Sequence, residues 1–404
     1  MILSTNLSQQ FLLDPDVVFL NHGSFGACPR PVFEDYQRWQ LKLERQPVAF
    51  LDSRRNLATN LGAARQVLAT EMGTSPDNIA QVSNATTGLN IVIQSLQLKA
   101  GDEILTTNHE YNALEKTWVY VARRTGAKIV VVTVPLPLNS AEAFTQTVLA
   151  GITDKTKVLF LSHITSPTAL LFPIEAAVAE ARKRGIISVI DGAHTPGHVP
   201  LDLDALGADF YAGNCHKWLM SPKGSGFVYA RPDRQVMVDP LVISHGWTAD
   251  NKEPGVRGPF GGSAFVDEIE MQGTRDPAPW LAVPAAIAFR REHDWWKVAA
   301  DCRRLAQETA ARVRELTGLP ALSTPEFCAP QMVAMPIPPC DPIVIKNALM
   351  DQFGIEIPVF EWQGHYIARL SCQGYNTADQ MDLLVDALGE LLMLRPRAKR
   401  ASQA

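Results

Sequence analysis

The chain has 404 residues, of which 46% are hydrophobic and 20% are charged, and its formal net charge is −5. These values are ordinary for a soluble globular protein and allow one large and one smaller domain. They give no support to a nucleic-acid surface, because the basic run at residues 395–400 is short and is interpreted as a solvated tail. They also give no support to a membrane span, which needs ~20 consecutive apolar residues.

The N-terminus and the cysteines together indicate a cellular compartment. Residues 1–14 lack the basic start and the small-residue cleavage site of a signal peptide. The six cysteines are scattered and form no C-x-x-C pair, so we expect reduced thiols with neither a disulfide framework nor a metal site. The prediction is a cytoplasmic protein.

From residue 79 onward, short β-branched runs alternate with longer helical stretches such as 87–96 and 174–184. Several of the runs are apolar without alternation, which is typical of strands covered by helices on both faces. The pattern predicts an α/β domain with a mostly parallel sheet. The predicted strands are residues 79–82, 103–106, 128–134, 157–161, 186–190, 210–212 and 226–229.

After Gly273 the pattern becomes α+β. We predict helices at 279–291, 295–317 and 377–394, and strands at 331–336, 355–359 and 366–370. The chain is therefore divided into a large domain over 15–275 and a smaller one over 276–396, with residues 1–14 packing on the smaller. Because an open α/β sheet binds ligands outside the carboxyl ends of its strands, the strand-to-helix connections are the expected site.

Asp191 ends one of the buried strands and precedes Gly192 and Ala193. An aspartate in this position most often caps the following turn. Alternatively, its carboxylate pairs with a buried cation. If that cation is a pyridinium nitrogen, Asp191 keeps it protonated, and the ring becomes an electron sink for a carbanion.

Lys217 follows the next strand and lies between His216 and Trp218. A lysine in a turn is usually solvated, but here another apolar strand begins at Gly226, which places Lys217 near the edge of the sheet. Desolvation there lowers the pKa of a lysine by up to ~3–5 units, and imine formation requires a neutral amine. Since Asp191 and Lys217 end two successive strands, they can share one pocket.

A run of small hydroxyl and amide residues at 83–90 leads from a strand into a helix. Backbone N–H groups at this helix start suit a phosphate, although the same sequence also fits a plain N-cap. The helix dipole supplies only ~0.3–2 kcal/mol, so further donors are needed. The candidates are Asn214, His216 and Thr274. A phosphate-binding turn, an acid and then a lysine follow the order of a fold-type I pyridoxal-phosphate (PLP) enzyme.

With these motifs the chain resembles the class V aminotransferase family, which also contains cysteine desulfurases, and within it the isopenicillin N epimerase-like branch. The resemblance implies a fold-type I PLP-dependent transferase, an amino-acid substrate, and a homodimer with its active sites at the subunit interface. It spans nearly the whole chain, with matches at residues 19–26, 84–88, 191–194, 216–218, 273–276, 369–371 and 375–377.

The resemblance also implies roles for single residues. Lys217 would hold PLP as a Schiff base and carry the Cα proton, Asp191 would pair with the pyridine nitrogen, and His194 would lie near the phenolic oxygen. Tyr111, preferred over His109, would stack on the ring. The phosphate would be held by Ala85, Thr86, Thr87, Asn214 and His216, and by Thr274 of the other subunit.

The resemblance further implies that Arg369 clamps the substrate carboxylate with a bidentate pair. Asn21 and His22 would line the substrate mouth. Two departures from the family pattern stand out. Residues 360–365 lack the catalytic cysteine of the desulfurases, and Cys372 lies beyond Arg369, so persulfide chemistry is not expected. His194 stands where relatives often have Gln.

The same core residues serve epimerisation, C–S β-elimination and transamination. The branch resemblance favours an amino-acid epimerase, with the lyase or the aminotransferase as alternatives. Epimerisation needs a second acid on the face opposite Lys217, and His22, Tyr111 and His245 are the candidates. Residues 46–50 and 245–247 are either specificity elements or ordinary loop and core residues.

Two other classes of protein fit the sequence less well. A binding protein without catalysis is disfavoured because neither the lysine nor the acid is missing. A nucleotide-binding oxidoreductase is disfavoured because no G-x-G-x-x-G follows an early strand.

Overall fold

The structure is a computed structural model, and it describes residues 7–248 and 256–394. The basic run at residues 395–400, the first six residues and the end of the predicted second domain lie outside the described residues.

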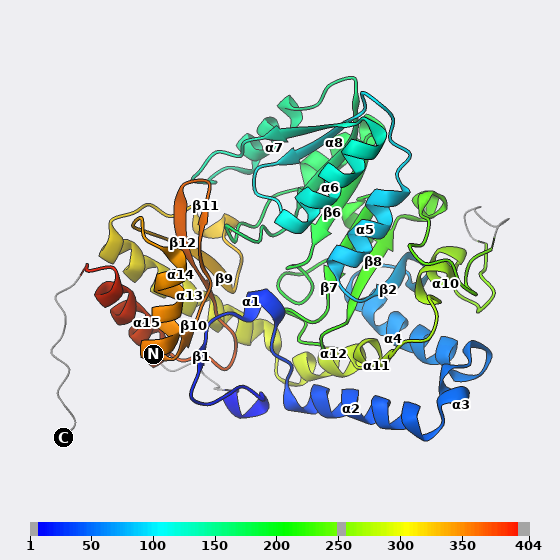
Figure 1. The fold of residues 1–404 in the computed structure, drawn as a ribbon, viewed down its shortest axis with the longest axis horizontal. Helices are drawn as coiled ribbons and strands as arrows, with labels where there is room; N and C mark the ends of the chain where they lie inside the picture. Colours follow the sequence, from blue (N-terminus) through cyan, green and yellow to red (C-terminus); the bar gives the residue numbers. More distant parts are fainter. Residues whose placement is uncertain (1–6, 249–255, 395–404) are drawn as a thin grey trace.

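A seven-stranded sheet in the order β2-β8-β7-β6-β5-β3-β4 forms the centre of the larger part (Figure 1). Only β8 runs against its neighbours, and the other six strands are parallel. The prediction of a mostly parallel sheet is therefore confirmed. The strands are β2 (Ile79–Val82), β3 (Glu103–Thr107), β4 (Lys128–Val132), β5 (Thr156–Ser162), β6 (Ile187–Gly192), β7 (Phe210–Asn214) and β8 (Gly226–Ala230).

Strand β5 shows how helices cover both faces of this sheet. Val158 and Phe160 pack in one apolar cluster, whereas Leu159 and Leu161 pack in another. Successive side chains of a strand point to opposite faces, so a continuous apolar run buries both. Burying each such side chain contributes ~1.5–3 kcal/mol. The first cluster includes α5 (Ala85–Ser95) and α6 (Asn112–Thr125), and the second α4 (Ala58–Glu71), α7 (Ala141–Ala150) and α8 (Glu175–Lys183).

A three-stranded antiparallel sheet in the order β11-β12-β9 forms the centre of the smaller part, at the left of Figure 1. Helix α13 packs on β9 and on α15. These elements are α13 (Trp295–Thr317), β9 (Met332–Ile337), α14 (Pro342–Phe353), β11 (Val359–Trp362), β12 (His365–Ser371) and α15 (Ala378–Leu391).

The N-terminal segment packs on the smaller part. Strand β1 (Val18–Phe19) pairs in parallel with β10 (Ile355–Glu356), and Leu7 and Phe11 share an apolar cluster with α13 and β12. Helix α1 (His22–Phe25) follows and lies between the two parts (Figure 1). The chain then enters α2 (Arg30–Arg45), in the larger part of the molecule.

The remaining elements connect these layers. Helix α11 (Ala278–Leu281) and α12 (Val283–Glu292) pack against α2 and α4, so the start of the predicted second domain contacts the first. The domain boundary at residue 275 stays a prediction. The other short elements are η1 (Ser8–Gln10), α3 (Pro47–Leu51), η2 (Ser53–Leu57), η3 (Pro76–Asn78), α9 (Leu203–Leu206), η4 (Pro232–Met237), α10 (Ala264–Glu270) and η5 (Pro325–Phe327).

Several predicted elements differ in the structure. The strand expected at 355–359 is two strands, β10 and β11, which pair with different partners. Pro358 lies between them and has no N–H to donate to a ladder. The helix expected at 279–291 is likewise divided into α11 and α12, and the strand expected at 128–134 ends at Val132.

Candidate active site

A cavity of about 510 Å³ lies at the carboxyl ends of the parallel strands. Its wall comes from the connections that follow β2, β3, β5, β6 and β7, where the sequence placed the site. The predicted cofactor-binding residues in this wall are Ala85, Thr86, Thr87, Tyr111, Asp191, His194, Asn214, His216 and Lys217.

Asp191 is buried near the end of β6, and its Oδ1 accepts a hydrogen bond from the backbone N–H of Ala193 at 2.9 Å. The aspartate thus caps its own turn, as the simpler interpretation of the sequence had it, while its carboxylate also lines the cavity. Burial raises the pKa of Asp191 to about 6, although the Ala193 N–H and the charge of Lys217 oppose this rise. A cation placed against this carboxylate would offset the free-energy cost of desolvating its charged form.

Lys217 follows β7, which pairs in parallel with β6, so the structure brings Lys217 and Asp191 to one cavity. Its Nζ lies 3.1 Å from Nε2 of His194. Desolvation by burial lowers the pKa of Lys217 to about 7; the charge of Arg369 adds to this shift and the charge of Asp191 opposes it. A substantial fraction of neutral amine is therefore present at neutral pH, as imine formation requires.

The first turn of α5 also lines the cavity. Asn84 Oδ1 accepts from the Thr87 N–H at 2.8 Å, and Asn214 Oδ1 accepts from the Ala85 N–H at 2.8 Å. The N-cap expected as the plain interpretation is therefore present. The Thr87 hydroxyl is engaged as well, since it donates to Asn84 Oδ1 at 3.2 Å. Thr86 lines the cavity, and its amide and hydroxyl group remain as donors for an anion.

Two basic side chains also reach this wall. His216 donates from Nδ1 to the carbonyl oxygen of Ser225 at 3.0 Å, and burial lowers its pKa to about 4. The backbone of His216 is also packed against Gly26. A Cβ atom at position 26 would lie only 1.9 Å from the His216 carbonyl oxygen. Lys223, which the sequence reasoning missed, lines the cavity as well.

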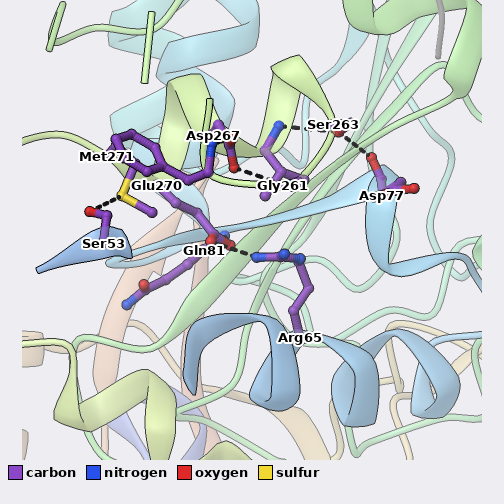
Figure 2. Close-up of polar contacts among 12 residues, drawn as sticks. Ser53, Arg65, Asp77, Gln81, Gly261, Ser263, Asp267, Glu270 and Met271 are labelled. Carbon is purple, nitrogen blue, oxygen red and sulfur yellow. Dashed lines mark hydrogen bonds and ion pairs between the residues drawn. The ribbon is translucent and has the colours of Figure 1, made fainter. Parts of the chain in front are cut away.

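Thr274 is exposed and does not line the cavity of its own chain. The segment before it is anchored by Glu270, which accepts from Arg65 Nη1 at 2.6 Å and from the Gln81 N–H at 3.0 Å (Figure 2). Arg275 extends the network by donating to Gln81 Oε1 at 3.0 Å. Because the Arg65–Glu270 pair is almost fully buried, losing one partner would leave an uncompensated charge. The anchor presents Thr274 at the surface.

Arg369, on β12, lies behind the cavity wall. Its Nη2 donates to Ser24 Oγ at 3.2 Å, and its Nη1 donates to the carbonyl and the hydroxyl group of Ser166. Ser24 and Ser166 both line the cavity. The buried Nε of Arg369 has no partner among the described residues, and burial lowers the pKa of the guanidinium to about 10. This donor set suits a carboxylate.

Asn21 and His22 do not line the cavity, in contrast to their predicted place at the substrate mouth. The Asn21 amide donates to Glu356 Oε1 at 3.0 Å, and its Oδ1 accepts from Ser24. His22 is fully buried behind Lys217. Its Nε2 donates to the Lys217 carbonyl oxygen at 3.0 Å, and burial lowers its pKa to about 3. Both residues therefore contact residues of the cavity wall, Ser24 and Lys217, without lining the cavity themselves.

Tyr111 lines the cavity and is 43% exposed, whereas His109 is fully buried and donates or accepts at Thr168 Oγ1, 2.8 Å away. Of the three candidates for a second acid, only Tyr111 is in the wall. His245 is exposed and outside it, as is the rest of 245–247. In the segment 46–50, Phe50 is a core side chain packed on Trp39.

Glu110 is a buried carboxyl group that the sequence reasoning missed. It accepts from Thr107 Oγ1 at 2.7 Å and from Ser162 Oγ at 2.6 Å. Ser162 is paired in register with Asp191 and lines the cavity. Burial raises the pKa of Glu110 to about 8, and the charge of Asp191 adds to the effect. Its position three residues after the end of the buried strand β3 was the signal that could have identified it.

These residues fit PLP. The cavity volume falls within the ~300–1,000 Å³ range of small-molecule sites. The buried carboxylate of Asp191 matches the cofactor ring, and Lys217, with its lowered pKa, matches the aldehyde. The donors at the helix start match the phosphate, and the buried guanidinium of Arg369, with its unpaired Nε, matches a substrate carboxylate. Across the described residues, no three His, Cys, Asp or Glu side chains gather as metal ligands, and no helix is long and apolar enough to cross a membrane.

The aminotransferase class-V family model matches residues 27–384. The chain is 37% identical to isopenicillin N epimerase of Amycolatopsis lactamdurans, over 96% of this chain and 98% of that protein. It is 28% identical to L-cysteine desulfhydrase of Arabidopsis thaliana, over 93% and 88%. Its fold is that of a C-DES mutant with glycine covalently linked to its PLP cofactor, with a TM-score of 0.80 and 22% identity over 95% of this chain and 98% of that chain. Cysteine desulfurase CsdA of Escherichia coli gives a TM-score of 0.78 at 21% identity, over 96% and 98%.

Proposed function

The chain belongs to the aminotransferase class-V family and is thus a PLP-dependent enzyme, and on this premise we propose that it is an epimerase acting at Cα of an amino acid. The observation that carries the proposal is the 37% identity to two isopenicillin N epimerases over 96% and 95% of the chain. The L-cysteine desulfhydrases match at 27–28%. Isopenicillin N, or an amino acid that resembles it, is the substrate we propose.

When bound, PLP supplies the electron sink that accepts the electron pair left at Cα. The chain's own residues do the rest. Lys217, whose pKa is lowered to about 7, would hold the cofactor and then take the Cα proton. Asp191 would keep the ring nitrogen protonated. Arg369, with Ser24 and Ser166, would fix the substrate carboxylate and so set which bond at Cα faces Lys217.

Inversion also needs a proton donor on the other face. We propose Tyr111, because it lines the cavity from the start of α6 while Lys217 enters from the turn after β7. His22 is unsuited to the role, since both of its ring nitrogens are engaged with Tyr375 and the Lys217 carbonyl oxygen.

We further propose a homodimer that completes the site. Phe25 lines the cavity yet is 71% exposed, and Thr274 is exposed on its anchored segment. A second copy that covers Phe25 and contributes Thr274 would account for both. The cytoplasmic location stays a prediction.

A C–S lyase is the second candidate. The L-cysteine desulfhydrases support it, and the residues that remove the Cα proton would be the same. The cavity wall contains no cysteine, which disfavours a persulfide-forming route but leaves direct β-elimination open.

The experiment that separates these reactions uses Cα-deuterated amino acids, including isopenicillin N and thioether amino acids, with Lys217→Ala as the inactive control. Loss of deuterium together with inversion supports the epimerase. Loss of deuterium without inversion contradicts it, and pyruvate and ammonia from a thioether substrate would establish the lyase instead.

A further inference from the structure

Trp218, the residue after Lys217, is fully buried and lies against two imidazole rings. Its ring stacks on His198, with centroids 3.9 Å apart and planes 19° apart, and lies 5.0 Å from His22. The indole Nε1 points to His194 Nδ1 at 3.3 Å. The indole is therefore packed on two neighbouring rings, and its one polar atom meets the histidine that contacts Lys217.

The donor inventory of these groups determines where the proton of His194 lies. An indole N–H can only donate, so Nδ1 of His194 must offer a lone pair. Burial keeps the ring neutral by lowering its pKa well below the usual value. A neutral imidazole carries one proton, which must then be on Nε2, the atom 3.1 Å from Lys217 Nζ. Lys217 accepts this proton's hydrogen bond, which requires an unprotonated amine.

The backbone of His194 is held independently of this bond. His198 donates from Nδ1 to the His194 carbonyl oxygen at 3.0 Å, and its Nε2 accepts from the Gln331 N–H at 2.8 Å. The other charged or titratable groups that act on His194 or Lys217 are Asp191, His216 and Arg369. Of the described groups, Trp218 is the one that bonds to the Nδ1 atom.

We propose that Trp218 is a positioning residue: by donating to Nδ1, it keeps His194 in the Nε2–H tautomer, so that His194 donates to the Lys217 amine and cannot accept from its ammonium form. The proposal deepens the proposed function, since it explains how the lysine that would hold PLP is kept neutral. The tautomer itself depends on neither cofactor nor substrate.

The direct test is ¹⁵N NMR of histidine-labelled full-length protein without cofactor, with His194→Gln used to assign the His194 signals. We expect an unprotonated Nδ1 in the wild type and a protonated Nδ1 in Trp218→Phe, which keeps an aromatic ring beside His22 and His198. A protonated Nδ1 in the wild type would overturn the proposal, and so would an unchanged tautomer in Trp218→Phe. Should Trp218→Phe not fold, the wild-type signal still decides.

The second readout is the pH dependence of reductive trapping of PLP on Lys217. In Trp218→Phe, Nε2 becomes free to accept from the ammonium, so the midpoint should rise by about 1 pH unit. Trp280→Phe is the matched control, because Trp280 is equally buried and its indole N–H has no partner among the described residues; it should leave the midpoint unchanged.

A double variant separates the tautomer from packing. The side chain of glutamine has no tautomer to switch, so Trp218→Phe should shift the midpoint much less in a His194→Gln background. An equal shift in both backgrounds would assign the effect to packing and overturn the proposal. Absence of trapping in the wild type would instead count against the PLP function, while the NMR result would stand on its own.

Discussion

The Nη2 atom of Arg369 donates to Oγ of Ser24 at 3.2 Å, and this bond joins the small antiparallel sheet to helix α1 at the wall of the cavity. Ser24 in turn donates to Asn21, which is bonded to Glu356. Two segments at opposite ends of the chain therefore hold one guanidinium in place.

Replacing Arg369 should weaken substrate use far more than cofactor binding. In Arg369→Lys, the planar two-pronged donor is lost and Ser24 and Ser166 lose their partner. We expect a cost of about 2–4 kcal/mol, or a fall of roughly 30- to 1,000-fold in kcat/KM. Steady-state kinetics measure this, with the cofactor absorbance as the control. Ser24→Ala should cost only ~0.5–1.5 kcal/mol; a change in the cofactor spectrum alone would argue against this role.

Glu110→Gln should change how stability depends on pH. Because burial raises the pKa of Glu110 to about 8, the folded state favours the protonated form. That contribution is fully present below the ordinary pKa of about 4.5 and is lost as pH rises through about 8. The variant has no carboxyl group to titrate at this position. Its free energy of unfolding, measured relative to that of the wild type, should therefore increase by about 2–5 kcal/mol between pH 5 and pH 8.

Urea unfolding of the cofactor-free protein at both pH values measures this difference. Glu308→Gln, at an exposed position on α13, is the control. If Glu110→Gln and the control follow the same pH profile as the wild type, Glu110 is ionised in the folded protein.

Tyr111→Phe should separate the two proton transfers of an epimerisation. The ring is kept, so cofactor binding should persist, but the hydroxyl group that would serve the second face is removed. We expect inversion to slow by about 10²–10⁴-fold while exchange of the Cα hydrogen with solvent continues. Chiral chromatography and proton NMR on the same reaction measure the two rates. If Tyr111→Phe kept the wild-type rates of both inversion and hydrogen exchange, Tyr111 would be excluded as the second acid.

Thiol reagents should leave the enzyme active. None of the six cysteines lines the cavity, and burial raises the pKa of Cys328 to about 11 and that of Cys28 to about 12, so reactive thiolate is scarce. Iodoacetamide at pH 7.5 should not change the turnover of any accepted amino acid. Rapid inactivation that follows labelling of one cysteine would point to a thiol in the reaction.

The sequence was most informative where one element determines the position of a residue. Asp191 and Lys217 follow successive strands, and parallel pairing of β6 with β7 is enough to bring them together. The unbroken apolar run of β5 similarly required helices on both faces. In each case the periodicity of a strand carries the spatial information.

Residues that meet only through tertiary packing could not be placed in this way. Ser24 and Ser166 reach Arg369 from distant segments, and nothing in the local pattern indicates that contact. His22 was assigned to the substrate mouth by its motif, but packing against Tyr375 and Trp218 places it behind Lys217. Pro358, by contrast, was a local signal for the break between β10 and β11 that the pattern of β-branched residues obscured.

The most direct test of the proposed site is to locate the lysine that holds the cofactor. Lys217 and Lys223 both line the cavity, and Lys217 has its pKa lowered to about 7 beside Asp191 and His194. Borohydride reduction of the yellow holoenzyme, followed by peptide mass spectrometry, should place the pyridoxyl group on Lys217 alone. A pyridoxyl group on Lys223, or a protein that takes up no PLP, would contradict the site described above.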